Sequence, residues 1–131
     1  MTNQVFRRLN TTPQMMSVLG DTELLQAMLD FEGGLAHAGS RCDLFEPSVA
    51  DTIKRCCQIS EFSIIELSEM ASQHGTVVVP LVNQLTKLVS AFDKPASSWV
   101  HFGATSQDVI DTAMVLQRKK AVDILEGGVA R

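Results

Sequence analysis

Cysteine is scarce in this sequence, and the few cysteines present form no recognisable pattern. The chain has three, Cys42, Cys56 and Cys57, an odd number without the spacing of a zinc knuckle. The adjacent pair, Cys56 and Cys57, could form only a strained disulfide. Reduced thiols in a cytoplasmic protein are therefore the expected state.

Long hydrophobic runs are missing as well. The longest, Val77–Val82, is interrupted by Pro80 and is far shorter than the roughly 20 residues of a membrane span. The segment Met1–Asn10 has two arginines but no apolar stretch after them, so we expect no signal peptide. These absences predict a soluble protein that does not associate with a membrane.

The chain also lacks an excess of positive charge. It carries 11 basic and 15 acidic residues, a net charge of -4, and its basic clusters are only Arg7-Arg8, Lys54-Arg55 and Arg118-Lys119-Lys120. Such scattered charge makes nucleic acid an unlikely partner. His37 and His74 have no partner at metal-ligand spacing, so we expect no metal site, and no P-loop, dinucleotide fingerprint or catalytic-triad motif is present.

What the sequence does have is hydrophobic residues at helical spacing. They make up 45% of 131 residues, enough for one domain with a core, and their period predicts an all-α fold. Helices are expected from a cap at Asp21 to about Ala38, from Glu46-Pro47, from a cap at Ser60 to Gly75, from Pro80 to Phe92, and from Ser106 to about Glu126. The apolar stripe of the first comprises Leu24, Met28, Phe31 and Leu35. Gly33-Gly34 within it indicates either a close helix crossing or local weakness.

Two segments do not follow the helical period. Thr76–Val79 has the propensity of a strand, and Asp93–Ser98, which contains Pro95, is typical of a loop.

The segment 100–112 is the most informative for function. Gly103 supplies a flexible turn before a helix start, where unpaired N–H groups and the positive end of the helix dipole favour an anion. The hydroxyls of Thr105 and Ser106 and the ring of His101 would add further donors. Thr105 and Asp108 also stand at the spacing of a capping box. From these residues alone, a carboxylate or phosphate site and an ordinary helix cap both remain open.

The wording of this segment resembles a known signature. Residues 101–108, His-Phe-Gly-Ala-Thr-Ser-Gln-Asp, with 109–113 after them, look like the first signature region of the fumarase/aspartase superfamily. The Gly-Ala-Thr-Ser-Gln-Asp part resembles the 3-carboxymuconate cycloisomerases in particular. Residues 29–36 and 75–82 are similar to other parts of the family, so the resemblance extends from about Gly20 to Leu125. Gly33-Gly34, where the family usually has alanines, and Phe102, where cycloisomerases often have tryptophan, depart from it.

The resemblance implies a fold, a reaction and roles for residues. Residues 1–104 would form the amino-terminal helical domain, which ends in the signature loop, and 105–131 the truncated first helix of the central bundle. The enzyme would be a cycloisomerase in which a carboxylate of the muconate adds across a double bond and closes a lactone, in protocatechuate breakdown. His101 and Ser106 would be catalytic. The substrate-binding residues would be His101, Gly103, Thr105, Ser106 and Gln107, with Asp108 as a helix cap.

The resemblance also implies partners and a limit. No metal or cofactor is implied, the substrate would be a small polycarboxylate, and the full-length protein would be a homotetramer with shared active sites. The family's second, histidine-bearing region and its third, serine-bearing loop are not in this sequence, so the 131-residue chain alone is expected to be inactive.

Two other interpretations stay open. The first keeps the fold but makes the substrate adenylosuccinate, in a lyase that carries out β-elimination. The second is a helical domain that catalyses nothing and only binds a partner or itself.

Overall fold

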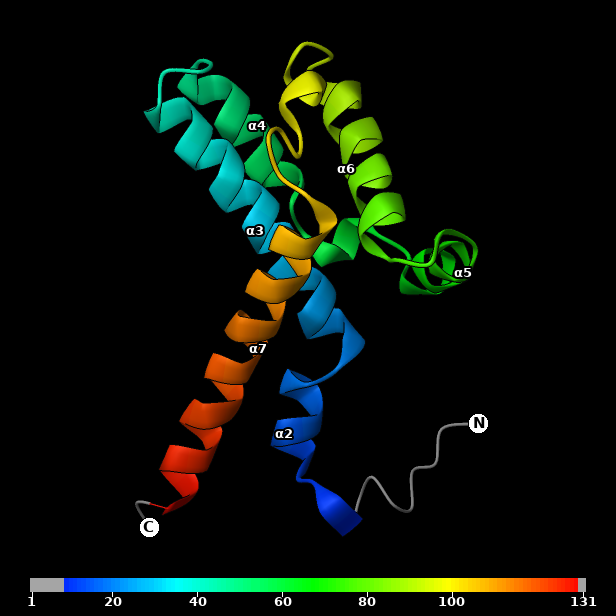
Figure 1. Ribbon diagram of the computed structural model, residues 1–131, viewed down its shortest axis with the longest axis vertical. Helices are drawn as coiled ribbons and strands as arrows, with labels where there is room; N and C mark the ends of the chain where they lie inside the picture. Colours follow the sequence, from blue (N-terminus) through cyan, green and yellow to red (C-terminus); the bar gives the residue numbers. More distant parts are fainter. Residues whose placement is uncertain (1–8, 130–131) are drawn as a thin grey trace.

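The computed structural model describes residues 9–129, and every regular element in that range is helical, as the sequence predicts (Figure 1). The α-helices are α2 (Pro13–Val18), α3 (Asp21–Arg41), α4 (Pro47–Cys56), α5 (Ile64–His74), α6 (Val78–Phe92) and α7 (Ser106–Val129), with 3-10 turns η1 (Ile59–Glu61) and η2 (Ala96–Trp99). No helix in this part of the chain is both long and apolar enough to cross a membrane. Most of Met1–Asn10, the segment considered above as a signal peptide, lies outside the described residues.

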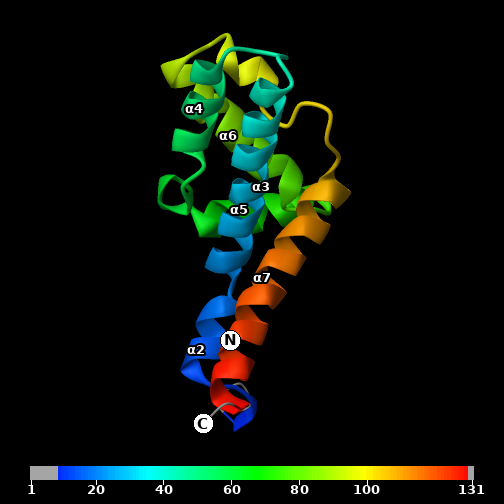
Figure 2. The same cartoon turned by 90° about the vertical axis from the view of Figure 1, so that its left-hand side faces the viewer.

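Helix α3 is the centre of the arrangement. It packs against α4 along one half and against α7 along the other, and α7 then continues beside α2 (Figures 1 and 2). The core consists of apolar side chains from α3, α4, α5, α6, η2 and α7, with the segment just after α4. Its largest fully buried members are Met28, Leu29, Ile53, Leu67, Leu81, Leu85, Val78, Val89, Val109 and Pro80. Helix α3, which contributes more buried residues than any other described helix, thus contacts both the loop before α7 and α7 itself.

The apolar stripe of α3 is displaced from the one that the sequence predicts. Met28 is buried as expected, but Leu24, Phe31 and Leu35 are only partly buried. The stripe that faces the core consists of Leu25, Met28, Leu29, Glu32, Gly33 and Ala36. Because α3 packs on two helices at once, its buried face is broad, and a single predicted stripe covers only one edge of it.

Several helix boundaries follow directly from capping chemistry. Pro47 begins α4 with Glu46 as its N-cap, and Gly75 ends α5 in the left-handed conformation, with φ of 69°; both were predicted. Two predicted caps are wrong. Gly20, not Asp21, is the N-cap of α3, and Asp21 lies in the first turn, where its charge suits the helix dipole.

The second wrong cap is Ser60, which lies in η1. Ser63 caps α5 instead, accepting a hydrogen bond from the N–H of Glu66. Ser63 stands directly before the helical run, at the spacing that a cap requires.

The strand propensity of Thr76–Val79 is overridden. Val78 and Val79 belong to the first turn of α6, and Pro80 follows in that turn, where its missing N–H costs nothing. The Thr76 hydroxyl accepts a hydrogen bond from the N–H of Val78 at 3.2 Å. Val78 is buried in the core, so packing on the neighbouring helices outweighs the β-branched preference.

Gly33 marks a close approach between α3 and α4. A Cβ atom at this position would lie 3.6 Å from Lys54 Cγ and 3.8 Å from Cys57 Sγ, in ordinary van der Waals contact. Nothing lies within 4 Å of the corresponding point at Gly34. An added Cβ would therefore fit at both positions, and neither glycine is required by a close helix crossing.

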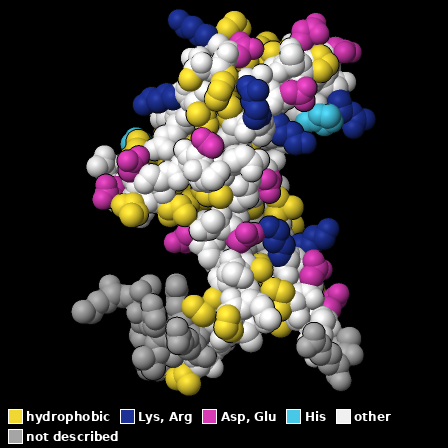
Figure 3. All heavy atoms as spheres, turned by 180° about the vertical axis from the view of Figure 1, so that it is seen from behind, with side chains coloured by type: hydrophobic (Ala, Val, Ile, Leu, Met, Phe, Trp, Pro, Cys, Tyr) yellow, Lys and Arg dark blue, Asp and Glu magenta, His cyan; other side chains and the backbone are white. Residues whose placement is uncertain are grey.

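Helix α7 is attached mainly at its beginning. Only Val109 and Ala113 are buried, whereas five of its large apolar side chains are exposed: Met114, Val115, Val122, Leu125 and Val129. Farther along, Gln117 Nε2 donates to Gly20 O at 3.2 Å, and Lys120 Nζ lies 2.6 Å from Glu23 Oε2. Figure 3 shows exposed hydrophobic side chains on the lower part of the molecule, where α2 and α7 lie.

The contrast between the core and α7 can be tested with one substitution at two places. Leu29→Ala in α3 removes a fully buried side chain and should lower the free energy of unfolding by about 2–5 kcal/mol. Leu125→Ala in α7, where the side chain is 57% exposed, should change it by less than about 0.5 kcal/mol. Urea unfolding monitored by circular dichroism measures both, and equal losses would contradict this description of the core.

Candidate functional site

The loop that leads into α7 is held by three aromatic side chains. The ring of Trp99 lies between those of Phe45 and Phe102, with centroid separations of 4.8 Å to each. Phe45 in turn fits over Gly39, because a Cβ atom there would come within 2.8 Å of the ring. The stack fixes the loop against the end of α3, and Trp99 is its central ring.

Two residues of the loop adopt the left-handed backbone conformation. Gly103 has φ of 76°, and His101 has φ of 59°, one of two non-glycine residues with positive φ in residues 9–129. For an L-residue this conformation costs roughly 1–2 kcal/mol. Strain of this kind is common at functional sites and persists where surrounding contacts fix the residue. For His101 this contact comes from Glu32 in α3.

The start of α7 presents hydroxyl groups to solvent. Thr105 is exposed and Ser106 partly exposed, and neither hydroxyl has a hydrogen-bond partner among the described residues. Asp108 Oδ2 instead accepts a hydrogen bond from the backbone N–H of Thr105 at 2.8 Å, which is one half of a capping box. The other half, in which the Thr105 hydroxyl would accept from a helix N–H, is not formed among the described residues, so this hydroxyl stays available.

Gln107 points elsewhere. It is exposed, and its Nε2 donates to Asp111 Oδ1 at 2.6 Å, one turn along the same helix. The geometry therefore brings His101, Gly103, Thr105 and Ser106 together within one short loop, with Gln107 on the helix surface beside them.

Glu32 joins this group from the middle of α3, and sequence reasoning gave it no function. Its Oε1 lies 2.6 Å from His101 Nδ1, its side chain is fully buried, and that of His101 is 20% exposed. Oε2 is buried too and has no hydrogen-bond partner in residues 9–129. A signal did exist, since Glu32 is the only charged residue on the buried stripe of α3.

Burial raises the pKa of Glu32 above its usual value of 4.5, against the opposing effect of His101. Desolvation penalises the carboxylate, and a single histidine offsets only part of that penalty. The carboxyl group therefore keeps its proton to a higher pH than an exposed glutamate does.

Two cysteines and a histidine that were named from the sequence, Cys56, Cys57 and His74, have structural roles. Cys56 and Cys57 are buried free thiols, and burial raises the pKa of Cys57 to about 12, so it is a neutral packing group. His74 Nδ1 lies 2.8 Å from Met70 O, one turn earlier at the end of α5, so its side chain contacts the last turn of its own helix.

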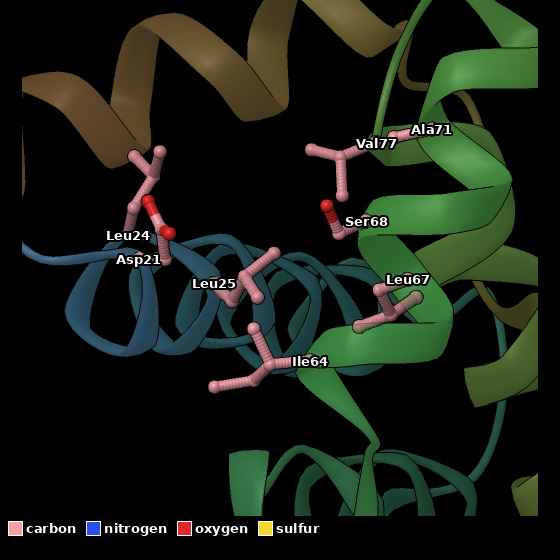
Figure 4. Close-up of a pocket in the computed structure, with 8 residues that line it drawn as sticks. All are labelled: Asp21, Leu24, Leu25, Ile64, Leu67, Ser68, Ala71 and Val77. Atoms are coloured by element: carbon pink, nitrogen blue, oxygen red, sulfur yellow. The ribbon is translucent and has the colours of Figure 1, made fainter. Parts of the chain in front are cut away.

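A hollow of about 210 Å³ lies between α3 and α5, away from the loop (Figure 4). Its walls are mostly apolar, and Asp21 and Ser68 are its only polar side chains. The lining residues are Asp21, Leu24, Leu25, Ile64, Leu67, Ser68, Ala71 and Val77. It therefore lacks donors that converge on an anion.

The raised pKa of Glu32 predicts a specific pH dependence of stability. The folded chain keeps a proton that the unfolded chain releases near the usual value, so the stability linked to Glu32 is present below about pH 4.5 and is lost as pH rises through the raised pKa. Glu32→Gln should therefore gain stability relative to wild type as pH increases from 4.5. Urea unfolding of both proteins across this range measures the difference, and a constant difference would refute the shift.

Similarity to known proteins extends over the whole chain. No family model matches the chain. It is 36% identical over 131 residues to 3-carboxy-cis,cis-muconate cycloisomerase of Pseudomonas putida, which covers all of this chain and 31% of that protein. It is 30% identical over 115 residues to adenylosuccinate lyase of Methanocaldococcus jannaschii, covering 88% of this chain and 24% of that one. The chain thus spans about a third of the length of the curated relatives it matches, or less.

Solved structures give the same picture for the fold. The 3-carboxy-cis,cis-muconate lactonizing enzyme of Pseudomonas putida superposes with a TM-score of 0.91 at 37% identity, covering 95% of this chain and 28% of that one. A fumarate lyase from Mesorhizobium sp. BNC1 gives 0.74 at 26% identity, covering 85% and 25%. In sequence and in fold, the chain is therefore similar to about 30% of the length of 3-carboxy-cis,cis-muconate cycloisomerases, and its fold matches that of the fumarase/aspartase-type lyases.

Proposed function

We propose that this chain is the amino-terminal portion of an enzyme that converts 3-carboxy-cis,cis-muconate into its lactone, and that the loop 101–106 binds a carboxylate of the substrate. The observation that carries the proposal is at the start of α7, where the hydroxyls of Thr105 and Ser106, which have no partner in residues 9–129, follow the partly exposed His101 by four and five positions. The similarity to cycloisomerases over the whole chain supports the choice of substrate.

The loop offers the kinds of donor that a carboxylate needs. The first N–H groups of a helix have no partner within it, and the dipole adds partial positive charge at that end. The hydroxyls of Thr105 and Ser106 can donate to the same anion, and Gly103 leaves space for it to approach the backbone. Asp108 already occupies the N–H of Thr105, so the groups left for the ligand are the hydroxyls and the amides that follow.

The reaction proposed is an intramolecular addition. One carboxylate of the muconate attacks a carbon of a double bond, closing the lactone ring, and a proton is added at the carbon next to another carboxylate. Negative charge develops on that second carboxylate during the reaction. Hydrogen-bond donors held in place before the reaction stabilise it, typically by about 3–4 kcal/mol each. His101 and Ser106 take this role in the proposal.

We also propose how the chain fits a larger protein. Residues 1–104 form the amino-terminal domain, and 105–131 begin the central helix bundle of a homotetramer with shared active sites. The support is the exposed apolar surface of α7, which further helices would cover. Free buried thiols favour the cytoplasm as the compartment.

The adenylosuccinate alternative rests on the similarity to an adenylosuccinate lyase. A purine nucleotide needs a phosphate site in addition to the carboxylate site, so binding of adenosine monophosphate would favour it. An interaction domain without catalysis would require neither ligand.

A chimaera tests the proposal directly. Residues 1–131 of this chain would replace the aligned part of the Pseudomonas putida cycloisomerase, and turnover of 3-carboxy-cis,cis-muconate would be followed in steady state. We expect Thr105→Ala and Ser106→Ala each to lower kcat about 10²–10³-fold, the usual cost of one donor to a developing charge. The 131-residue chain alone is expected to show no turnover.

Thr112→Ala is the matched control, because Thr112 is an exposed hydroxyl residue farther along α7. It should leave kcat and KM unchanged. If Thr105→Ala and Ser106→Ala both keep the activity of the chimaera, the carboxylate assignment is wrong and the interaction domain becomes the better interpretation.

A further inference from the structure

We propose that Glu32 is a positioning residue for His101: it holds Nδ1 and makes the ability of Nε2 to donate a hydrogen bond depend on one proton shared by the pair. This deepens the carboxylate site and rests on the proposed function for its role in binding, although the arrangement of the pair does not.

The geometry assigns the two ring nitrogens different roles. Nδ1 lies 2.6 Å from Glu32 Oε1, so that nitrogen is committed to the core of the protein. Nε2 has no hydrogen-bond partner among residues 9–129, and the ring is partly exposed. Rotation of the ring to present the other nitrogen would break the contact between Nδ1 and the buried carboxyl group. Nε2 is therefore the atom left for a ligand.

The state of Nε2 follows from the number of protons in the pair. With two protons, the pair is either a carboxylate beside an imidazolium or a carboxylic acid beside a neutral ring, and Nε2 carries a proton in both. With one proton, that proton lies between Glu32 and Nδ1, and Nε2 is bare. The two-proton pair donates to an anion and the one-proton pair does not, wherever the shared proton resides.

The surroundings favour the two-proton pair. The one-proton pair has a net negative charge, and Oε2 of Glu32 is buried with no hydrogen-bond partner in the described part of the chain to stabilise that charge. Burial and His101 are what alter the pKa of Glu32.

Charged and titratable groups on the neighbouring elements do not replace His101. On α3 itself, Asp30 is exposed and accepts a hydrogen bond from Gln26. From α4, Lys54 is exposed and contributes its stem to the contact with Gly33, and the Cys57 thiol that follows is neutral. From α7, Asp108 and Asp111 accept hydrogen bonds from Thr105 and Gln107.

A carboxylate that binds to Nε2 must therefore meet the two-proton pair. Above the pH at which the pair loses its second proton, binding takes up one proton, and affinity falls by up to tenfold per pH unit. Glu32 thus makes the binding of a carboxylate depend on the protonation state of the pair.

The arrangement can be tested without a ligand by ¹⁵N NMR of the histidine ring in the 131-residue chain. In wild type at alkaline pH, the proton should be on Nδ1 and Nε2 should be bare. Glu32→Met removes the acceptor with little change in volume, and the neutral ring should then carry its proton on Nε2. A wild-type ring with its alkaline proton on Nε2, or the same tautomer in both proteins, would overturn the proposal.

Glu32→Gln is the second variant, and it keeps the hydrogen bond if Glu32→Met fails to fold. It removes the negative charge but leaves an amide oxygen that can accept from Nδ1, so the neutral ring should keep its proton on Nδ1, in contrast to Glu32→Met. A Glu32→Gln ring whose alkaline proton is on Nε2 would equally refute the role of Glu32. Since neither NMR readout needs a substrate, an inactive chimaera with the expected tautomers would reject the proposed function and leave the positioning role intact.

Discussion

The bond between Glu32 and His101 connects the core of the chain to the loop before α7. Glu32 lies on the buried stripe of α3, the helix against which α4 and α7 both pack. His101 is held in a backbone conformation that few residues adopt. The interaction crosses 69 positions in the sequence, so it exists only when α3 and the loop are both in place. Folding of the core and formation of the site are thus the same event.

Packing and chemistry support each other around this bond. The aromatic stack of Phe45, Trp99 and Phe102 fixes the loop from one side, and the buried start of α7 fixes it from the other. Asp108 accepts a hydrogen bond from the backbone N–H of Thr105 and so forms one half of a capping box. These contacts leave other groups unoccupied among the described residues: Nε2 of His101 and the hydroxyls of Thr105 and Ser106. The unoccupied groups are those proposed to meet the substrate.

Much of the fold could be predicted from the sequence because helical periodicity and capping are local. The Pro47 start and the Gly75 stop depend on residues within one turn, and both predictions are confirmed. The strand propensity of Thr76–Val79 misled because burial of Val78 depends on helices distant in sequence. The apolar stripe of α3 was placed one row off for a related reason, since two partners widen its buried face. That error also hid Glu32, whose charge is conspicuous only on the correct stripe.

Part of the candidate site could also be predicted from the sequence, and part could not. Residues 101–108 form one continuous segment, so the sequence alone was enough to single them out. The partner of His101 could not be found there, because no spacing rule relates residues from two elements that meet only in the folded chain.

The left-handed conformation of His101 also restricts which residues could replace it. Asparagine, aspartate and glycine tolerate positive φ, but β-branched side chains do not. None of the tolerant residues has a ring that reaches both the buried carboxyl group and the ligand. Few substitutions at position 101 would therefore preserve both the backbone conformation and the contacts of the ring. Loss of the histidine would require a change in the loop conformation and not only the exchange of one side chain.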